Sequence, residues 1–151
     1  MLNNLWVNST KQIKIEKKSI HRIVLKLKEI LNFNVNSLQI NFVDDDYIHE
    51  INKTYLNHDY STDIITFNYS SVKNALEGEI YICIKDAIDN SQKFNVNLDS
   101  EIVRLVTHGI LHLLGYDDIT IPKKKKMKTL EDELVFSIEK NFKNLLIKYD
   151  C

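Results

Sequence analysis

Apolar residues recur with two different periods along this chain of 151 residues. Between Lys17 and Leu31 they fall at helical spacing, which predicts an amphipathic helix. Shorter runs rich in β-branched and aromatic residues predict strands, and longer runs between them predict further helices. We expect strands over Leu38–Val43, Ile64–Tyr69 and Glu79–Ile84, and one or two more over Leu5–Val7 and Gln12–Ile15. We expect the other helices after the capping residues Asp44–Asp46, over Lys85–Phe94, over Asp99–Leu114 and from Pro122 to about Lys148.

The order of these elements predicts an α+β fold, in which a small mixed sheet of about four strands packs against about five helices. The helix over Asp99–Leu114 carries apolar residues around most of its circumference, so we expect it to be buried. Asp99 or Ser100 can cap this helix, and Gly115 is a natural stop because glycine adopts the left-handed conformation that ends helices. The chain length and its single proline favour one compact domain over residues 1–151.

Composition and charge narrow the range of functions. No apolar stretch approaches the ~20 residues of a membrane span, and Met1 to Thr10 lacks the features of a signal peptide, so we expect a cytoplasmic protein. The formal net charge of −1 does not indicate a nucleic-acid binder. Contact with RNA would need a local patch such as Lys123–Lys126, although this run also fits a solvated helix start. Cys83, in an apolar run, and Cys151, the last residue, indicate neither a disulfide framework nor a cysteine metal site.

The segment HGILHLLGYDD, residues 108–118, carries the strongest chemical signal. His108 and His112 are four residues apart on one face of the expected helix, so both imidazoles can reach one ion. Gly115 allows the chain to reverse, and Asp118 follows where the pattern H-E-x-x-H-x-x-G-x-x-H of zinc proteases has its third ligand. Gly109 stands where that pattern has its glutamate base, which argues against a peptidase. We therefore expect one metal ion per chain, held by His108, His112 and Asp118.

Several alternatives stay open from the residues alone. The histidines could be hydrogen-bonded core residues, although an unpaired polar ring is costly in an apolar helix. Asp117 competes with Asp118 for the metal, or accepts a hydrogen bond from a ligand histidine. Zinc suits two imidazoles and a carboxylate with an open fourth position, but nickel, cobalt and manganese also bind such donors. An open fourth position would let the metal activate a water molecule as a nucleophile.

Three segments resemble a known family. The HGILHLLGYD run resembles the HGxLHLxGYD core of the YbeY endoribonucleases. Residues 59–67, DYSTDIITF, resemble the D-x-P-T-D-V-L-S-F stretch of that family, and residues 78–82, GEIYI, resemble its G-D-I-x-I-S strand. The three motifs occur in the family's order, and the resemblance covers nearly the whole chain.

This resemblance implies a zinc-dependent, single-strand-specific endoribonuclease that acts in 16S rRNA 3′-end maturation and ribosome quality control. The reaction would be attack of metal-activated water on a phosphodiester. The implied partners are the 16S rRNA precursor and the small ribosomal subunit, whereas neither a membrane nor DNA is expected. A different class of function is a ribosome-assembly factor that binds rRNA or a small-subunit protein and whose metal is mainly structural. A peptide hydrolase is a third class, which the missing glutamate disfavours.

The sequence departs from the family at two functional positions. Asp118 stands where the family usually has a third histidine, and Leu56 stands where it commonly has an arginine. RNA-binding candidates are His58, Arg104 and the lysines Lys123, Lys124, Lys125 and Lys126. Asp63 of the second motif fits a loop hydrogen bond at least as well as catalysis. We expect Tyr116 to pack against the last helix rather than touch substrate.

Overall fold

A four-stranded mixed sheet forms the base of the fold. The computed structural model describes residues 1–57 and 62–150. Three parallel strands and one antiparallel edge strand follow the order β1-β3-β5-β4. Their bounds are Leu5–Ser9 for β1, Asn34–Val43 for β3, Ala75–Cys83 for β5 and Ile64–Asn68 for β4. The mixed sheet of four strands that the sequence predicts is therefore confirmed.

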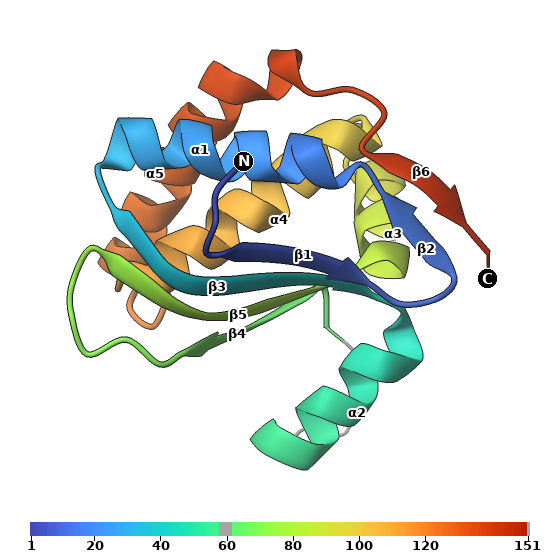
Figure 1. Cartoon of the computed structure of the whole chain (residues 1–151), viewed down its shortest axis with the longest axis horizontal. Helices are drawn as coiled ribbons and strands as arrows, with labels where there is room; N and C mark the ends of the chain where they lie inside the picture. Colours follow the sequence, from blue (N-terminus) through green and yellow to red (C-terminus); the bar gives the residue numbers. More distant parts are fainter. Residues whose placement is uncertain (58–61, 151) are drawn as a thin grey trace.

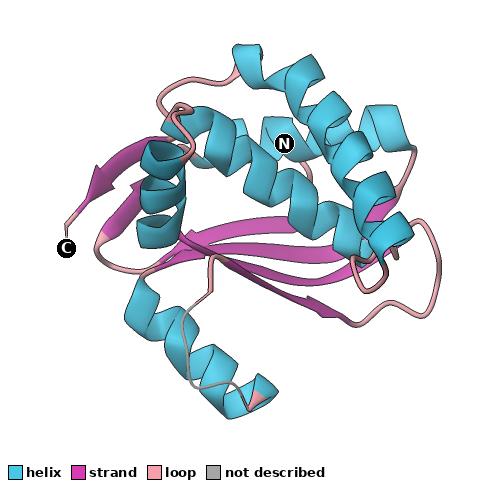
Figure 2. Ribbon diagram, turned by 180° about the vertical axis from the view of Figure 1, so that it is seen from behind, coloured by secondary structure: helices cyan, strands magenta, loops and turns pink. Residues whose placement is uncertain are grey.

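Helices cover the two faces of this sheet unequally. Of the five described α-helices, four lie over one face of the sheet, and one lies below the other face (Figures 1 and 2). The four are α1 (Lys17–Leu31), α3 (Ile84–Lys93), α4 (Leu98–Leu113) and α5 (Ile121–Ile138), and the helix below is α2 (Asp45–Leu56). Helix α4 contacts β4 and β5 on one side and α1, α3 and α5 on the others. The segment that carries His108 and His112 therefore lies on the most enclosed of the described helices, as the apolar composition of α4 predicts.

Strand alternation explains where the core lies. In β5, Ile80 and Ile82 point towards the four helices and are 0% exposed, whereas Tyr81 between them points to the other face. A smaller apolar cluster on that face joins α2 to the sheet. Cys83 belongs to this cluster as a small core residue, and its burial raises the pKa of the thiol to about 12.

The chain beyond α5 differs from the sequence prediction. We expect a helix to about Lys148, but α5 ends at Ile138 and a single 3-10 turn, Glu139–Asn141, follows. Asn144 adopts a left-handed conformation with φ 57°, and Leu146–Tyr149 forms β6, antiparallel to β2 (Ile13–Ile15). Tertiary pairing therefore overrides helical propensity here.

The cap of α4 also differs from the prediction. The side chain of Asn97 accepts a hydrogen bond from the backbone N–H of Ser100 at 2.7 Å, so Asn97 caps the helix. Asp99 instead accepts from the backbone N–H groups of Asn144 and Leu145, at 3.1 and 3.0 Å. Asp99 therefore stabilises the turn at Asn144 that precedes β6, and it does not cap α4.

Among the described helices, none has the combination of length and apolarity that crossing a bilayer requires.

Candidate metal centre

The end of α4 sets the direction of the loop that carries Asp118. The N–H of Gly115 donates to the carbonyl of His112 at 3.0 Å, and the N–H of Tyr116 donates to the carbonyl of Leu111 at 3.1 Å. Gly115 has φ +101°, a conformation that side chains rarely adopt, and nothing lies within 4 Å of where its Cβ would be. The glycine therefore provides the reversal that the sequence predicts and returns the chain past the helix end.

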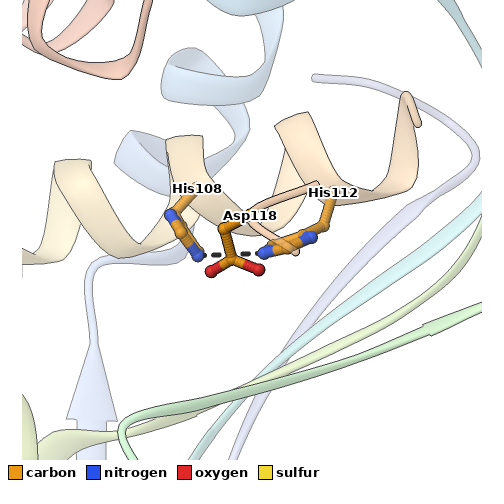
Figure 3. Close-up of side chains that lie close together, drawn as sticks. All are labelled: His108, His112 and Asp118. Carbon is orange, nitrogen blue, oxygen red and sulfur yellow. Dashed lines mark hydrogen bonds between the residues drawn. The ribbon is translucent and has the colours of Figure 1, made fainter. Parts of the chain in front are cut away.

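This reversal brings three side chains together. The Nε2 atoms of His108 and His112 lie 3.1 Å apart, and the donor atoms of both histidines and of Asp118 all lie within 4.8 Å of one another. Figure 3 shows the Asp118 carboxylate facing the gap between the two rings. Both histidines are half-buried, whereas Asp118 is exposed.

The donor set fits a transition metal. Two imidazole nitrogens on one tetrahedral zinc ion, each ~2.0–2.1 Å from it, would be about 3.3 Å apart. The observed 3.1 Å between Nε2 of His108 and Nε2 of His112 is close to this value. The two imidazoles and the carboxylate could therefore hold a metal ion, and donor type alone does not select zinc over its neighbours.

Glu131 of α5 lies behind His108. Its Oε1 atom is 2.5 Å from Nδ1 of His108, and its Oε2 atom accepts from Nη1 of Arg104 at 2.7 Å. Burial acts to lower the pKa of His108, but the hydrogen bond and the charge of Glu131 outweigh it, so that pKa is raised above its usual 6.5. Burial likewise acts to raise the pKa of Glu131, yet its partners His108 and Arg104 hold it below its usual 4.5.

His112 has a different environment. Burial lowers its pKa below 6.5, and the positive charge of neighbouring His108 lowers it further. Besides the contact of its Nε2 with His108, its ring is hydrogen-bonded to the backbone of Tyr116, and no carboxylate is among its described hydrogen-bond partners. A neutral imidazole is the form that binds metal, so this environment favours the ligand state of His112.

Gly109, between the two ligands in sequence, faces the sheet. A Cβ atom there would lie 2.9 Å from Cδ1 of Ile80 and 3.2 Å from Cδ1 of Ile64. The glutamate base of the zinc-protease pattern would therefore have no space at this position. Close packing of α4 on β4 and β5 gives a physical reason for the glycine.

Asp117 does not belong to the three-residue group. Its Oδ1 atom accepts from the backbone N–H of Ile119 at 3.1 Å, and its Oδ2 atom lies 3.5 Å from Nζ of Lys123. The geometry thus favours Asp118 over Asp117 as the third ligand. Tyr116, partly buried, packs against the main core and lines a hollow with Leu130 of α5, as expected.

Asp63 lies near the metal group, which consists of the side chains of His108, His112 and Asp118. It lines a hollow of about 470 Å³ that His108 also lines. Its Oδ2 atom accepts from the side-chain amide of Asn90 at 3.3 Å, and the same amide donates to Glu101 at 3.4 Å. The loop hydrogen bond that we expect for Asp63 is present. Its charge also contributes to the raised pKa of His108.

The RNA-binding candidates lie in different surroundings. The lysines Lys123 to Lys126 are exposed at the start of α5. Two of them, Lys123 and Lys126, line a hollow of about 410 Å³ together with Lys73 of the β4–β5 connection. Arg104 pairs with Glu131 and Asp132. His58 lies outside the described residues, and Leu56 is the last residue of α2.

Sequence reasoning missed Glu131 and Lys73. Glu131 is 23 positions from His108, and no local spacing connects them. Its only signal in the sequence is that it falls on the apolar stripe of α5, between Met127 and Leu134, and in the structure it is 7% exposed. Lys73 is an isolated lysine in a turn, so the sequence carries no sign that it approaches α5.

Comparisons with known proteins identify relatives of this chain. A family model described as endoribonuclease YbeY matches residues 5–139. Two similar proteins, each named endoribonuclease YbeY, come from Flavobacterium johnsoniae and Cytophaga hutchinsonii. The first is 41% identical over 108 residues, covering 70% of this chain and 77% of the relative. The second is 41% identical over 100 residues, covering 66% and 70%. The solution structure of TM1509 from Thermotoga maritima matches with a TM-score of 0.59 and 26% identity, covering 91% of this chain and 93% of that one.

Proposed function

Because the chain belongs to the YbeY endoribonuclease family, we propose that it is a zinc-dependent endoribonuclease specific for single-stranded RNA. Its substrate in this proposal is the 16S rRNA precursor, and its setting is 3′-end maturation and quality control on the small ribosomal subunit. The observation that supports this most is the group of two imidazoles and one carboxylate on an enclosed helix and its following loop. We also propose that residues 1–151 act as one domain in the cytoplasm.

The chemistry follows from the donors that are present. A bound divalent ion would supply a Lewis acid that activates water and polarises the phosphodiester. His108 and His112 would hold the ion through Nε2, and Asp118 would hold it through a carboxylate oxygen. The carboxylate neutralises one positive charge, so this site would be less positive than one with three neutral imidazoles. Gly109 supplies no base, so a proton acceptor must come from elsewhere in the site.

Asp63 is the best-placed described carboxylate for that role outside the ligand set. It lines the hollow that reaches His108, and its hydrogen bond to Asn90 fixes its direction. Asp63 immediately precedes β4, so the edge strand positions it relative to α4. We include it as an accessory group whose substitution should lower the cleavage rate and leave metal binding intact.

A cleavage assay tests the proposed function. Purified protein, stripped of metal and reloaded with zinc, should cut a single-stranded RNA and leave a duplex of the same sequence intact. His112→Ala should lose this activity, and parallel reloading with manganese, cobalt or nickel would identify the preferred ion. Tight RNA binding without cleavage under every metal would overturn the nuclease proposal. That result would favour an assembly factor that binds rRNA or a small-subunit protein and uses its metal structurally.

A further inference from the structure

Glu131 joins the ligand-bearing helix to α5 through two hydrogen bonds. Its Oε1 atom faces Nδ1 of His108 at 2.5 Å, and its Oε2 atom faces Nη1 of Arg104 at 2.7 Å. His108 and Arg104 are four residues apart on α4, so one carboxylate spans one helical turn. The side chain of Glu131 is 9% exposed, which means that water competes little for either bond.

The bond to Nδ1 decides which nitrogen of His108 is available. A neutral imidazole has one N–H and one lone pair. A carboxylate accepts hydrogen bonds and does not donate them, so Glu131 keeps the proton on Nδ1 and leaves the lone pair on Nε2. Nε2 is the atom that faces His112 and the metal group.

Arg104 in turn fixes the carboxylate. Its Nη1 atom lies 2.7 Å from Glu131 and 2.7 Å from the exposed Asp132. Without Arg104, the second oxygen of Glu131 would have no described donor, and the carboxylate could rotate about its last bond. The guanidinium therefore aligns Glu131 as Glu131 aligns His108.

We propose that Glu131 is a positioning residue for the metal site, holding His108 in the tautomer that presents Nε2 as a ligand, and that Arg104 holds Glu131 in place. This inference rests on the proposed function only in taking the His108, His112 and Asp118 group as a metal site. It assigns Arg104 a task other than contact with RNA.

The test compares variants by two readouts that need no RNA. One is zinc affinity, measured by competition with a chelator. The other is the ¹⁵N chemical shifts of His108 in metal-free protein, at a pH where the imidazole is neutral. Glu131→Leu should weaken zinc binding about 10–100-fold, the usual effect of removing such a partner, and should shift proton density from Nδ1 towards Nε2.

A second variant guards against simple misfolding. Glu131→Gln has one acceptor oxygen for two donors, so its zinc affinity should fall between those of wild type and Glu131→Leu. Arg104→Met alone removes the donor that aligns Glu131, so its zinc affinity should also fall below that of wild type. Asp132→Asn serves as the matched control, because it removes an Arg104 partner without touching His108, and its zinc affinity and ¹⁵N shifts should stay at wild-type values.

The outcomes separate the two proposals. Wild-type zinc affinity and wild-type ¹⁵N shifts in folded Glu131→Leu would overturn the positioning role of Glu131, and wild-type zinc affinity in folded Arg104→Met would overturn the role of Arg104. A wild-type protein that binds no zinc would contradict the proposed function instead. In that case the ¹⁵N shifts of metal-free protein still decide whether Glu131 sets the tautomer.

Discussion

The metal group joins two regions of opposite character. His108 and His112 lie on α4, whose intervening residues Ile110 and Leu111 are 0% exposed. Asp118 lies on a loop in which the next residue, Ile119, is 85% exposed. Packing around α4 fixes the backbone that carries the two half-buried histidines, whereas the carboxylate depends on a glycine turn and a few local hydrogen bonds. Two donors are therefore preorganised by the fold, and the third can adjust.

This contrast has an energetic origin. A helix packed against a sheet and three other helices cannot shift without disturbing many contacts. A loop held by backbone bonds near Gly115 can move by small changes in a few dihedral angles. Ligand replacement should therefore be tolerated better at position 118 than at 108 or 112.

The largest expected effect comes from filling the packed side of the helix. Gly109→Glu places a side chain against Ile80 and Ile64. Overpacking of about 1–3 kcal/mol plus several kcal/mol for a buried carboxylate should remove most of the stability. Gly115→Glu, the matched change in open space, should cost only the ~1–2 kcal/mol of backbone strain. Denaturant unfolding of both variants measures the two losses of stability. Equal losses would contradict the difference in packing between positions 109 and 115.

Removal of a helix-borne donor should come next. His108→Ala and His112→Ala should each lose the bound metal, with affinity reduced by more than the ~100-fold upper figure for a supporting residue. The reason is that neither position can be refilled by a neighbouring donor on a rigid helix. Elemental analysis after gel filtration should show about one metal ion per wild-type chain and almost none in either variant. Full metal content in both variants would refute the assignment.

A smaller loss is expected on the loop side. Asp118→Ala should weaken zinc binding less than either histidine change, because the loop can adjust and Asp117 lies next to it. Asp117→Ala should weaken zinc binding less still, since its carboxylate is engaged with Ile119 and Lys123. Asp118→His should keep the metal. Titration of zinc affinity ranks the variants, and metal loss in Asp117→Ala alone would reverse the ligand assignment.

The contrast between regular packed elements and irregular segments also explains which parts of the fold the sequence predicts. Periodicity locates α1 at Lys17–Leu31 and places α4 within one residue at each end, because both are regular apolar elements. It fails after Ile138, where pairing of β6 with β2, two segments far apart in sequence, decides the structure. The sequence favours Asp99 or Ser100 as the cap of α4, whereas Asn97 fills this position, because three polar residues near one helix start are equivalent until tertiary partners are known.

The metal site shows a similar limit. His108, His112 and Asp118 are predictable because one short segment contains all three and its spacing carries the geometry. Glu131 is not, because its approach depends on how α5 packs against α4. The alternative that the histidines are satisfied core residues is partly realised, since His108 does have a buried hydrogen-bond partner, and that partner suits a ligand histidine equally well.

In metal-free protein, the pair formed by His108 and Glu131 should make the stability of the fold depend on pH. Burial opposes charge on both members of the His108–Glu131 pair, yet their contact raises the pKa of His108 above 6.5 and lowers that of Glu131 below 4.5. The pair's stabilisation is therefore complete between these two ordinary values. It is lost as pH rises through the raised pKa of His108, and also as pH falls through the lowered pKa of Glu131.

Thermal melts of wild type and Glu131→Gln test this directly. Their Tm difference should be largest, at a few degrees, between the two ordinary pKa values, and should shrink on the alkaline side. Glu133→Gln, an exposed change on the same helix, should show no such pH dependence. A Tm difference that grows as pH rises above neutrality would mean that the pair does not stabilise the charged imidazole.

The smallest effect should come from the exposed lysines beyond the loop. Lys123 and Lys126 line a hollow with Lys73, beside the loop that carries Asp118, whereas Lys124 and Lys125 lie outside that hollow. Each phosphate contact to single-stranded RNA contributes about 0.7 to the slope of log affinity against log salt. Changing Lys123 and Lys126 to Gln should therefore reduce the slope by at most about 1.4, because two contacts of about 0.7 would be lost.

Lys124 and Lys125, in the same run of lysines, provide the control for this experiment. Lys123 is already partly neutralised by Asp117 at 3.5 Å, so the measured reduction should fall below the maximum. Changing Lys124 and Lys125 to Gln removes the same charge from the same run and should alter the slope less. Zinc affinity should stay unchanged in both double variants, because neither pair contacts a ligand side chain. Equal slope changes in the two pairs would show that RNA responds to the overall charge of the helix start, and wild-type slopes in both would return the run to a solvated surface.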